Sequence, residues 1–337
     1  VPYRSEQYRK IRPNIYLKSD KLITMENDLA FNFKMKEMAD IYSLGELAVV
    51  LGLGYPGSNR SHFKSIALWE TGGDGTSGVG QSGWLTDDIN GLEGSELLDV
   101  HGISLDGGMG VFASSDGTWI SMTSIKKFQK LKHHKMEKVE THNPALSLLL
   151  DRSNQLNSAM ESISKKLGSF NDSARVRGGD LGDQLELALN CISAGINSPV
   201  IKVSHGSFDT HDNQSWRHND LLEDLSMAIF DTRKQLVKMD EWHNTLIMTY
   251  SEFGRTAYEN ASEGTDHGTA APHFLMGGGV KGGFYGKQPS LNNLKDGDMI
   301  FTTDYRSFYD TILSSWFSIN NNKFSEFNVP SLQKIIS

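Results

Sequence analysis

The chain has 337 residues, of which 38% are hydrophobic and 22% charged, values typical of a globular protein with an ample core. Its formal net charge of −8 argues against a nucleic-acid-binding surface, and no run of eighteen apolar residues is present to span a membrane. The single cysteine, Cys191, excludes an intramolecular disulfide and a zinc site built from cysteines.

The first half of the chain begins its regular pattern with an apolar run at 47–53, which predicts a buried strand. The stretch NRSHFKSIALWETGG follows, and it predicts a polar loop and then a helix that the glycines at 72–73 end. Further on, Asp116 and Gly117 between two β-rich runs predict a hairpin. Residues 126–171 are polar and helix-prone, which makes them the best candidate for an inserted helical cap.

The second half alternates helical and strand patterns. Helices are predicted within 180–196 and 220–239, and strands within 198–204, 244–250 and 271–279. This alternation indicates an α/β fold with a mainly parallel sheet that helices cover on both faces. In such sheets, ligands bind beyond the carboxyl ends of the strands.

Three polar clusters follow predicted strands, and they read NRSHFKS, HGSFDTHDNQ and SEFGRTAYENASEGTDHG. A parallel sheet would bring all three to one edge. Six of the eleven histidines lie between 205 and 273, interleaved with Asp209, Asp212, Glu252 and Asp266. Imidazoles with carboxylates are the ligand set for zinc, manganese or iron, so the pattern predicts a metal site. The alternatives are that Asp266 caps a turn and that His273 is a core histidine.

The first cluster also offers a nucleophile. Ser61 or Ser65 would stand at a helix N-terminus, where the dipole and free N–H groups stabilise an oxyanion. The alternative is that Ser61 merely caps the helix. Arg60 and Arg255 either hold an anionic group in bidentate fashion or pair with nearby acids.

These residues together resemble a bacterial family of unknown function, numbered fifteen-oh-one and placed in the alkaline phosphatase/sulfatase superfamily. The matching stretches are ELAVVLGLGYPGSNRSHFKSIALWETG, FDTHDNQ, TLIMTYSEFGRTAYEN, GTDHGTAAPHFLMGGGVKGGFYG and FTTDYRSFYDTILSSWF. They occur in family order and cover nearly the whole chain. The resemblance implies a single alkaline phosphatase-like domain over 1–337, with a doubly wound sheet and the helical cap at about 126–171.

The resemblance also implies hydrolysis of phosphate or sulfate esters through a serine nucleophile and one or two divalent metals, zinc, manganese or calcium. In the superfamily, the nucleophile lies about ten residues before a Thr-Gly pair. The same count from Thr71 and Gly72 reaches His62, so the resemblance implies that the adjacent Ser61 is the nucleophile, which would attack a small anionic ester. Arg60 or Arg255 would steady the anion. The implied metal ligands are Asp209, His211, Glu252, Asp266 and His267.

The chain departs from the superfamily pattern in two places and leaves alternatives open. Asp209 and His211 are two residues apart rather than four, and Glu252 and Phe253 stand where many relatives have Asp-His. The resemblance also implies a first strand with an Asp metal ligand, which is missing from the sequence that starts at Val1, and a leader that has been removed. Exported relatives imply a periplasmic or extracytoplasmic location. The alternatives are an inactive binding or assembly module of an exported complex and a metal-dependent mutase, and the oligomeric state is open.

Overall fold

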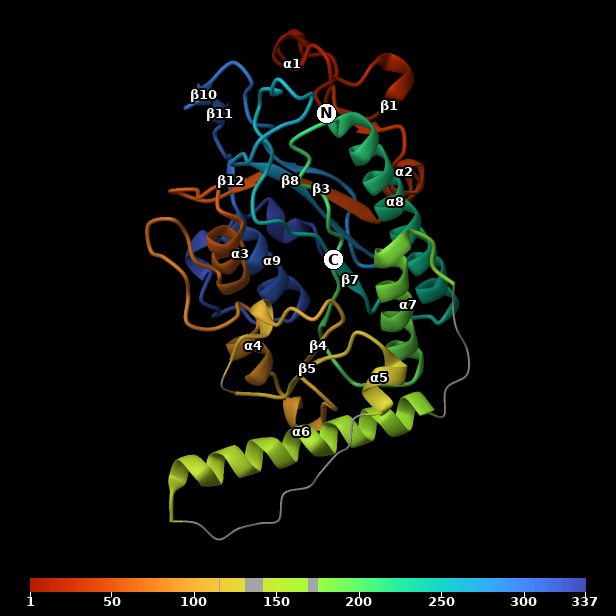
Figure 1. Ribbon diagram of the computed structural model, residues 1–337, viewed down its shortest axis with the longest axis vertical. Coiled ribbons are helices and arrows are strands. Elements are labelled where there is room, and N and C mark those ends of the chain that lie inside the picture. The colour runs from red at the N-terminus through yellow and green to blue at the C-terminus, as the bar shows by residue number, and fades with distance from the viewer. Residues whose placement is uncertain (115, 131–141, 169–174) are drawn as a thin grey trace. The chain divides into compact units, whose positions relative to one another are not determined.

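The computed structural model describes residues 1–114, 116–130, 142–168 and 175–337 (Figure 1). The chain divides into two compact units, which are Val1–Gln81 with Gly206–Ser337, and Ser82–His205. The second unit contains the segment 126–171 that the sequence predicts as a cap, of which 131–141 and 169–171 lie outside the described residues. The organisation of 1–337 as one domain stays a prediction.

The sheet of the first unit is built around β3 (Leu47–Gly54), which is buried at every residue. One edge of β3 pairs with the antiparallel β8 (Ala271–Gly277), and the other pairs in parallel with β9 (Gly283–Gly286) and β12 (Thr303–Asp304). Beyond β8 lies β7 (Leu246–Met248), antiparallel to it and therefore parallel to β3. The predicted α/β class is confirmed, and the sheet is mixed because β8 runs against the other strands.

Helices cover both faces of this sheet (Figure 1). The neighbouring residues His273 and Phe274 of β8 point to opposite faces, as strand geometry requires. The ring of His273 meets Trp69 of α3 at 5.4 Å, whereas Phe274 meets Phe31 at 6.2 Å. On the His273 face, Trp69 stacks at 4.1 Å on Tyr305, the first residue of α9.

On the opposite face, α2 packs against the long helix α8, and the backbone N–H of Met38 donates to the Ser226 hydroxyl at 3.0 Å. The helices named so far are α2 (Lys36–Ser43), α3 (His62–Thr71), α8 (Gln214–Lys238) and α9 (Tyr305–Thr311). The unit also contains α1 (Glu6–Ile11), β1 (Leu22–Thr24), β2 (Ala30–Asn32), β10 (Leu294–Lys295), β11 (Asp298–Met299) and a π-helical turn, Ile312–Trp316.

The second unit has its own parallel sheet in the order β5-β4-β6. Its elements are α4 (Thr86–Asn90), β4 (Gly102–Ser104), β5 (Trp119–Ser121), α5 (Ile125–Gln129), α6 (Pro144–Gly168), α7 (Gly179–Ser193) and β6 (Ile201–Lys202). Cys191 is buried in its core, as expected of a structural thiol. In the part of the chain that the structure describes, no helix has the length and apolar composition to cross a membrane.

One strand prediction is wrong in this unit, and another is confirmed only in part. The hairpin expected at Asp116 and Gly117 does not form, because β5 pairs in parallel with β4 while Gly110–Phe112 makes a 3-10 turn. The strand predicted within 198–204 is only β6, and it pairs with β4 rather than joining the sheet of the first unit. In both cases a distant partner strand overrides the local pattern.

The buried His273 makes the stability of the fold depend on pH. It is 5% exposed, and burial lowers its pKa to about 4, well below the ordinary value near 6.5 that it regains on unfolding. Between pH 6.5 and 4, His273 is protonated in the unfolded chain but neutral in the folded chain. Stability therefore falls as the pH drops through this range. Proton uptake by this histidine in the unfolded chain lowers the free energy of unfolding by about 2 kcal/mol at pH 5.

The variant His273→Gln is expected to lose this pH dependence. Urea unfolding at pH 7.5 and pH 5 should show a smaller loss of stability in the variant than in the wild type, by about 2 kcal/mol. The exposed His243 provides the control, and His243→Gln should behave as the wild type does. An equal loss in wild type and His273→Gln would contradict the assignment.

Candidate functional site

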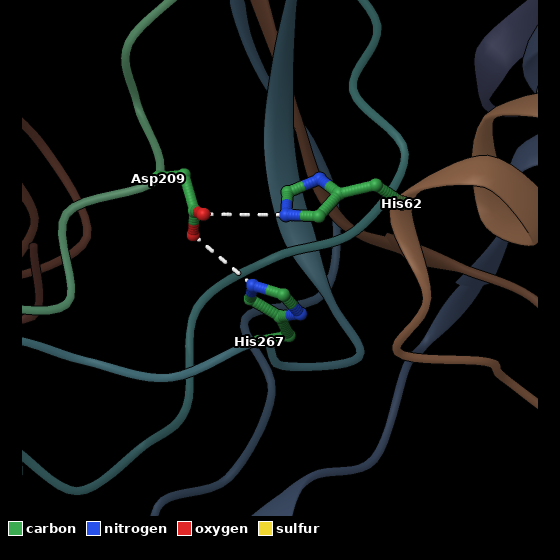
Figure 2. Close-up of side chains that lie close together, drawn as sticks. All are labelled: His62, Asp209 and His267. Atoms are coloured by element: carbon green, nitrogen blue, oxygen red, sulfur yellow. Dashed lines mark hydrogen bonds and ion pairs between the residues drawn. The ribbon is translucent and has the colours of Figure 1, made fainter.

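Three side chains from distant parts of the first unit meet at one point (Figure 2). His62 is the first residue of α3, Asp209 lies in the loop before α8, and His267 precedes β8. Figure 2 shows both imidazole rings turned towards the Asp209 carboxylate. One donor atom from each of the three lies within 4.8 Å of the others, which makes the group a candidate metal site.

The Asp209 carboxylate is the centre of this cluster. Its Oδ2 lies 3.2 Å from His62 Nε2, and its Oδ1 lies 3.0 Å from His267 Nε2. A third ring, His211, brings its Nε2 within 2.8 Å of the same Oδ1 and within 3.0 Å of His267 Nε2. His211 therefore adjoins the group of three on the side of Asp209 and His267, without belonging to it.

Each of the three imidazoles has an oxygen acceptor behind its other nitrogen. The contacts are His62 Nδ1 to Glu252 Oε1 at 2.8 Å, His211 Nδ1 to Asp266 Oδ1 at 2.9 Å and His267 Nδ1 to the Arg60 carbonyl at 2.7 Å. Because carbonyl and ionised carboxylate oxygens only accept hydrogen bonds, each Nδ1 carries the proton. When a cation occupies the site, the lone pair of Nε2 in each neutral ring faces it; without a cation, a second proton on Nε2 donates to Asp209.

This arrangement fits a metal ion. Imidazole lone pairs and a carboxylate repel one another at this range unless a cation or extra protons lie among them. The separations of 2.8–3.2 Å between Asp209 oxygens and ring nitrogens approach the roughly 3.3 Å between ligands of a tetrahedral zinc ion. Two imidazole nitrogens and one carboxylate, with a third imidazole beside them, suit zinc or another transition metal better than calcium, which prefers oxygen ligands.

The electrostatics of the cluster keep its centre negative. Burial alone would raise the pKa of Asp209, but the hydrogen bond and charge of Arg255, with the charges of His211 and His267, lower it to about 2. The hydrogen bond to Glu252 raises the pKa of His62, with the charge of Asp209 adding to the effect. An ionised carboxylate at the centre therefore attracts positive charge to the ring nitrogens.

The two candidate arginines are used differently. Arg255 donates to Asp209 Oδ1 at 2.6 Å, to the Thr265 hydroxyl at 3.1 Å and also to the Thr265 carbonyl, and only 14% of its side chain is exposed. It therefore orients Asp209, which is the pairing with an acid that the sequence left open. The Arg60 guanidinium is 46% exposed, and its one ion pair within the described residues is a 3.5 Å contact with Asp298, so it is accessible to an anion.

Glycines allow the site segments to approach one another closely. A Cβ added to Gly268 would lie 2.4 Å from the backbone of Arg255, and one added to Gly264 would lie 2.2 Å from the backbone of His211. Any side chain at either position would push these segments apart. The glycines of the stretch EGTDHG therefore help to set the position of His267.

The two candidate serines differ in exposure, and only Ser61 is accessible to a substrate. Ser61 occupies the N-cap position of α3 and is exposed, but its hydroxyl makes no capping hydrogen bond, so the capping alternative is not what the structure shows. Ser65 is fully buried and donates to the Asn59 carbonyl at 2.6 Å, which gives it a structural role. The structure also confirms the alternative that His273 is a core histidine, because its side chain is buried.

Three supporting side chains had no role assigned from the sequence. Phe253 stacks on His267 with ring centres 4.3 Å apart and lies 4.9 Å from the His62 ring. The Gln214 side-chain carbonyl accepts hydrogen bonds from Thr265 at 2.5 Å and Thr210 at 3.2 Å. Asn260 donates to the His211 carbonyl at 2.8 Å. The one available signal was the place of Phe253 directly after Glu252 at a predicted strand end.

Comparison with known families bears on all of these segments. The family model described as "Protein of unknown function (DUF1501)" matches residues 48–316. The chain belongs to this family. The match includes every residue of the cluster, so the cluster lies in the part of the chain that defines family membership. No curated protein and no solved structure matches the chain.

Proposed function

We propose that this family member is a metal-dependent hydrolase of phosphate or sulfate esters, with the doubly wound fold of the alkaline phosphatase/sulfatase superfamily that its sequence resembles. One observation carries the proposal. Three imidazoles turn Nε2 towards Asp209 while an oxygen acceptor holds each Nδ1. Acceptors of this kind orient histidine ligands in metal centres.

In the proposed centre, the metal ligands are Asp209 and the Nε2 atoms of the three rings, His62, His211 and His267. Glu252 and Asp266 then act behind His62 and His211, where they fix each ring and increase its basicity. The described donors converge on Asp209, which supports one ion. Zinc or manganese suits this donor set better than calcium.

Ser61 is the proposed nucleophile because its hydroxyl is exposed, uncapped and adjacent to His62. A bound divalent metal supplies a Lewis acid that stabilises negative charge on the ester oxygens and lowers the pKa of the hydroxyl. Ser61 Oγ gives its proton to solvent and forms the bond to phosphorus or sulfur as the bond to the ester oxygen breaks, and that oxygen leaves as an alcohol after taking a proton from solvent. A water oxygen then bonds to the same phosphorus or sulfur as its bond to Ser61 Oγ breaks, which releases phosphate or sulfate and restores the hydroxyl. The Arg60 guanidinium and the N-terminus of α3 hold the nonbridging oxygens.

The proposed substrate is therefore a small anionic ester. By resemblance to exported relatives, we propose a periplasmic or extracytoplasmic location. The negative net charge of the chain supports neither a nucleic acid substrate nor a nucleic acid partner.

Metal content and turnover test this proposal together. The protein equilibrated with zinc or manganese should hold about one equivalent and hydrolyse a member of a panel of aryl phosphates and sulfates. Ser61→Ala should reduce kcat at least about 1,000-fold without changing the metal content, whereas Ser43→Ala, at an exposed serine outside the cluster, should have no effect. Equal turnover by Ser61→Ala and wild type would remove Ser61 from the mechanism.

A second candidate function, an inactive binding module, has one observation in its favour. Phe253, which cannot bind a metal, stacks on His267 at the site. Metal binding without turnover of any ester would support this second function. A protein that takes up no metal would overturn the hydrolase proposal and the mutase alternative alike.

A further inference from the structure

An exposed aromatic ring stands beside the proposed centre. Phe63 follows His62 in the first turn of α3 and is 88% exposed, more than any other large hydrophobic side chain in the described ranges. The apolar residues Leu68 and Trp69 on the inner face of the same helix are buried. A phenyl ring left in water gives up the favourable free energy of burial, so a ligand that covers it would gain affinity.

The helix geometry directs this ring towards the site. Side chains on a helix lean towards its N-terminus, and Phe63 is the second residue of α3. Its ring therefore leans towards the end of the helix that carries Ser61 and His62. Because Phe63 is two positions from Ser61, a molecule whose reacting atoms lie at Ser61 can extend to this ring.

Two cations lie close to Phe63 in the sequence. Arg60 is 46% exposed and weakly paired, and Lys64 is exposed with no ion pair among the residues that the structure places. In a chain of net charge −8, two accessible cations thus lie within three positions of an exposed apolar ring. Single exposed apolar residues are ordinary on protein surfaces. The adjacent site and the two cations distinguish Phe63 from those.

We propose that Phe63 binds the non-reacting part of the substrate through a flat apolar face, either an aromatic ring or the apolar face of a sugar. Arg60 and Lys64 attract its anionic group to the same rim. This inference rests on the proposed function, since it names the class of ester that the site selects. Phe63 is thus a specificity-determining residue rather than a catalytic one.

Kinetics of the metal-loaded protein with methyl phosphate, phenyl phosphate and a hexose phosphate test this assignment. Wild type should prefer the phenyl or the hexose ester to methyl phosphate, and whichever is preferred identifies the ring. Phe63→Ala should reduce that preference about tenfold through KM, whereas Phe63→Tyr, which retains the ring, should keep it. The control is Leu44→Ala, at a side chain that is 58% exposed, and it should retain the wild-type preference.

Binding measurements separate this inference from the hydrolase proposal. Phenylphosphonate and methylphosphonate have no ester bond, and calorimetry with each reports recognition without turnover. If no ester is hydrolysed but Phe63→Ala removes a preference for phenylphosphonate, the recognition role of Phe63 stands and the hydrolase proposal fails. If esters are hydrolysed and Phe63→Ala keeps every wild-type preference, the inference is wrong. Failure of wild type to discriminate between the two phosphonates and among the three esters overturns it as well.

Discussion

Replacing His267 with alanine is expected to weaken zinc binding at least about 100-fold. Its Nε2 lies 3.0 Å from both Asp209 and His211, and its Nδ1 is held by the Arg60 carbonyl, so its removal takes away a fixed donor at the centre of the cluster. Competition with a chromophoric zinc chelator at pH 7.5 measures the affinity. The exposed His243 is the matched control, and His243→Ala should bind zinc as the wild type does.

A graded variant tests the role of the outer acceptors. Glu252→Gln keeps an oxygen behind His62 Nδ1 but removes its charge, so the zinc affinity should fall by about tenfold, less than in His267→Ala. Equal zinc affinity in wild type and both variants would show that the cluster is a network of protonated histidines around Asp209. A loss in His243→Ala as large as in His267→Ala would point to global unfolding instead.

The variant Arg306→Met is expected to lower the free energy of unfolding by about 3–5 kcal/mol. Arg306 is 7% exposed and donates to Asp74 at 2.5 Å and to Asp304 at 2.9 and 2.7 Å. Asp74 is itself buried, so a neutral side chain at 306 leaves its carboxylate without its cation. Urea unfolding followed by circular dichroism at pH 7.5 gives the difference.

An exposed arginine of the same unit provides the comparison. Arg217 pairs with Asp212 at 2.8 Å, with both side chains more than 40% exposed. Water and salt screen this pair, so Arg217→Met should cost less than about 1 kcal/mol. Similar losses of free energy of unfolding in the two variants would show that the buried Asp74–Arg306 pair stabilises the fold no more than an exposed ion pair does.

The sequence predicted the elements whose signals are local. The apolar run at 47–53 is β3, and the predicted strand within 271–279 contains β8. The helix between loop and glycine pair is α3, and it ends where Gly72 adopts a left-handed φ of 76°. Uninterrupted apolar residues and a C-terminal glycine depend little on the rest of the chain, which explains these successes.

Strand direction and partners depended on distant contacts and were not predictable in the same way. The antiparallel course of β8 follows from the tertiary fold, since its apolar pattern would suit either direction. Only two residues of the strand predicted within 198–204 form a strand, β6, and it pairs with β4. Strand patterns describe a half-buried surface, and the identity of the neighbouring strand is decided elsewhere in the chain.

The candidate site was predictable as a set of residues but not as a geometry. The polar clusters around 60, 209 and 267 do come together, although the strand expected to deliver Asp209 belongs to the other sheet. Composition does not reveal that Glu252 stands behind His62 or that Arg255 is occupied by Asp209. Those roles depend on rotamers and on close backbone approach at Gly264 and Gly268.

The first unit is discontinuous in sequence, and this has a consequence for how the chain matures. His62 lies in its opening segment, whereas Asp209 and His267 lie after the whole of Ser82–His205, and His62 and Asp209 are 147 positions apart. During synthesis the intervening unit emerges complete before the two halves of the first unit can meet. A metal ion bound across both halves would fasten them together as a late step of assembly, and chains without it would be the more easily degraded.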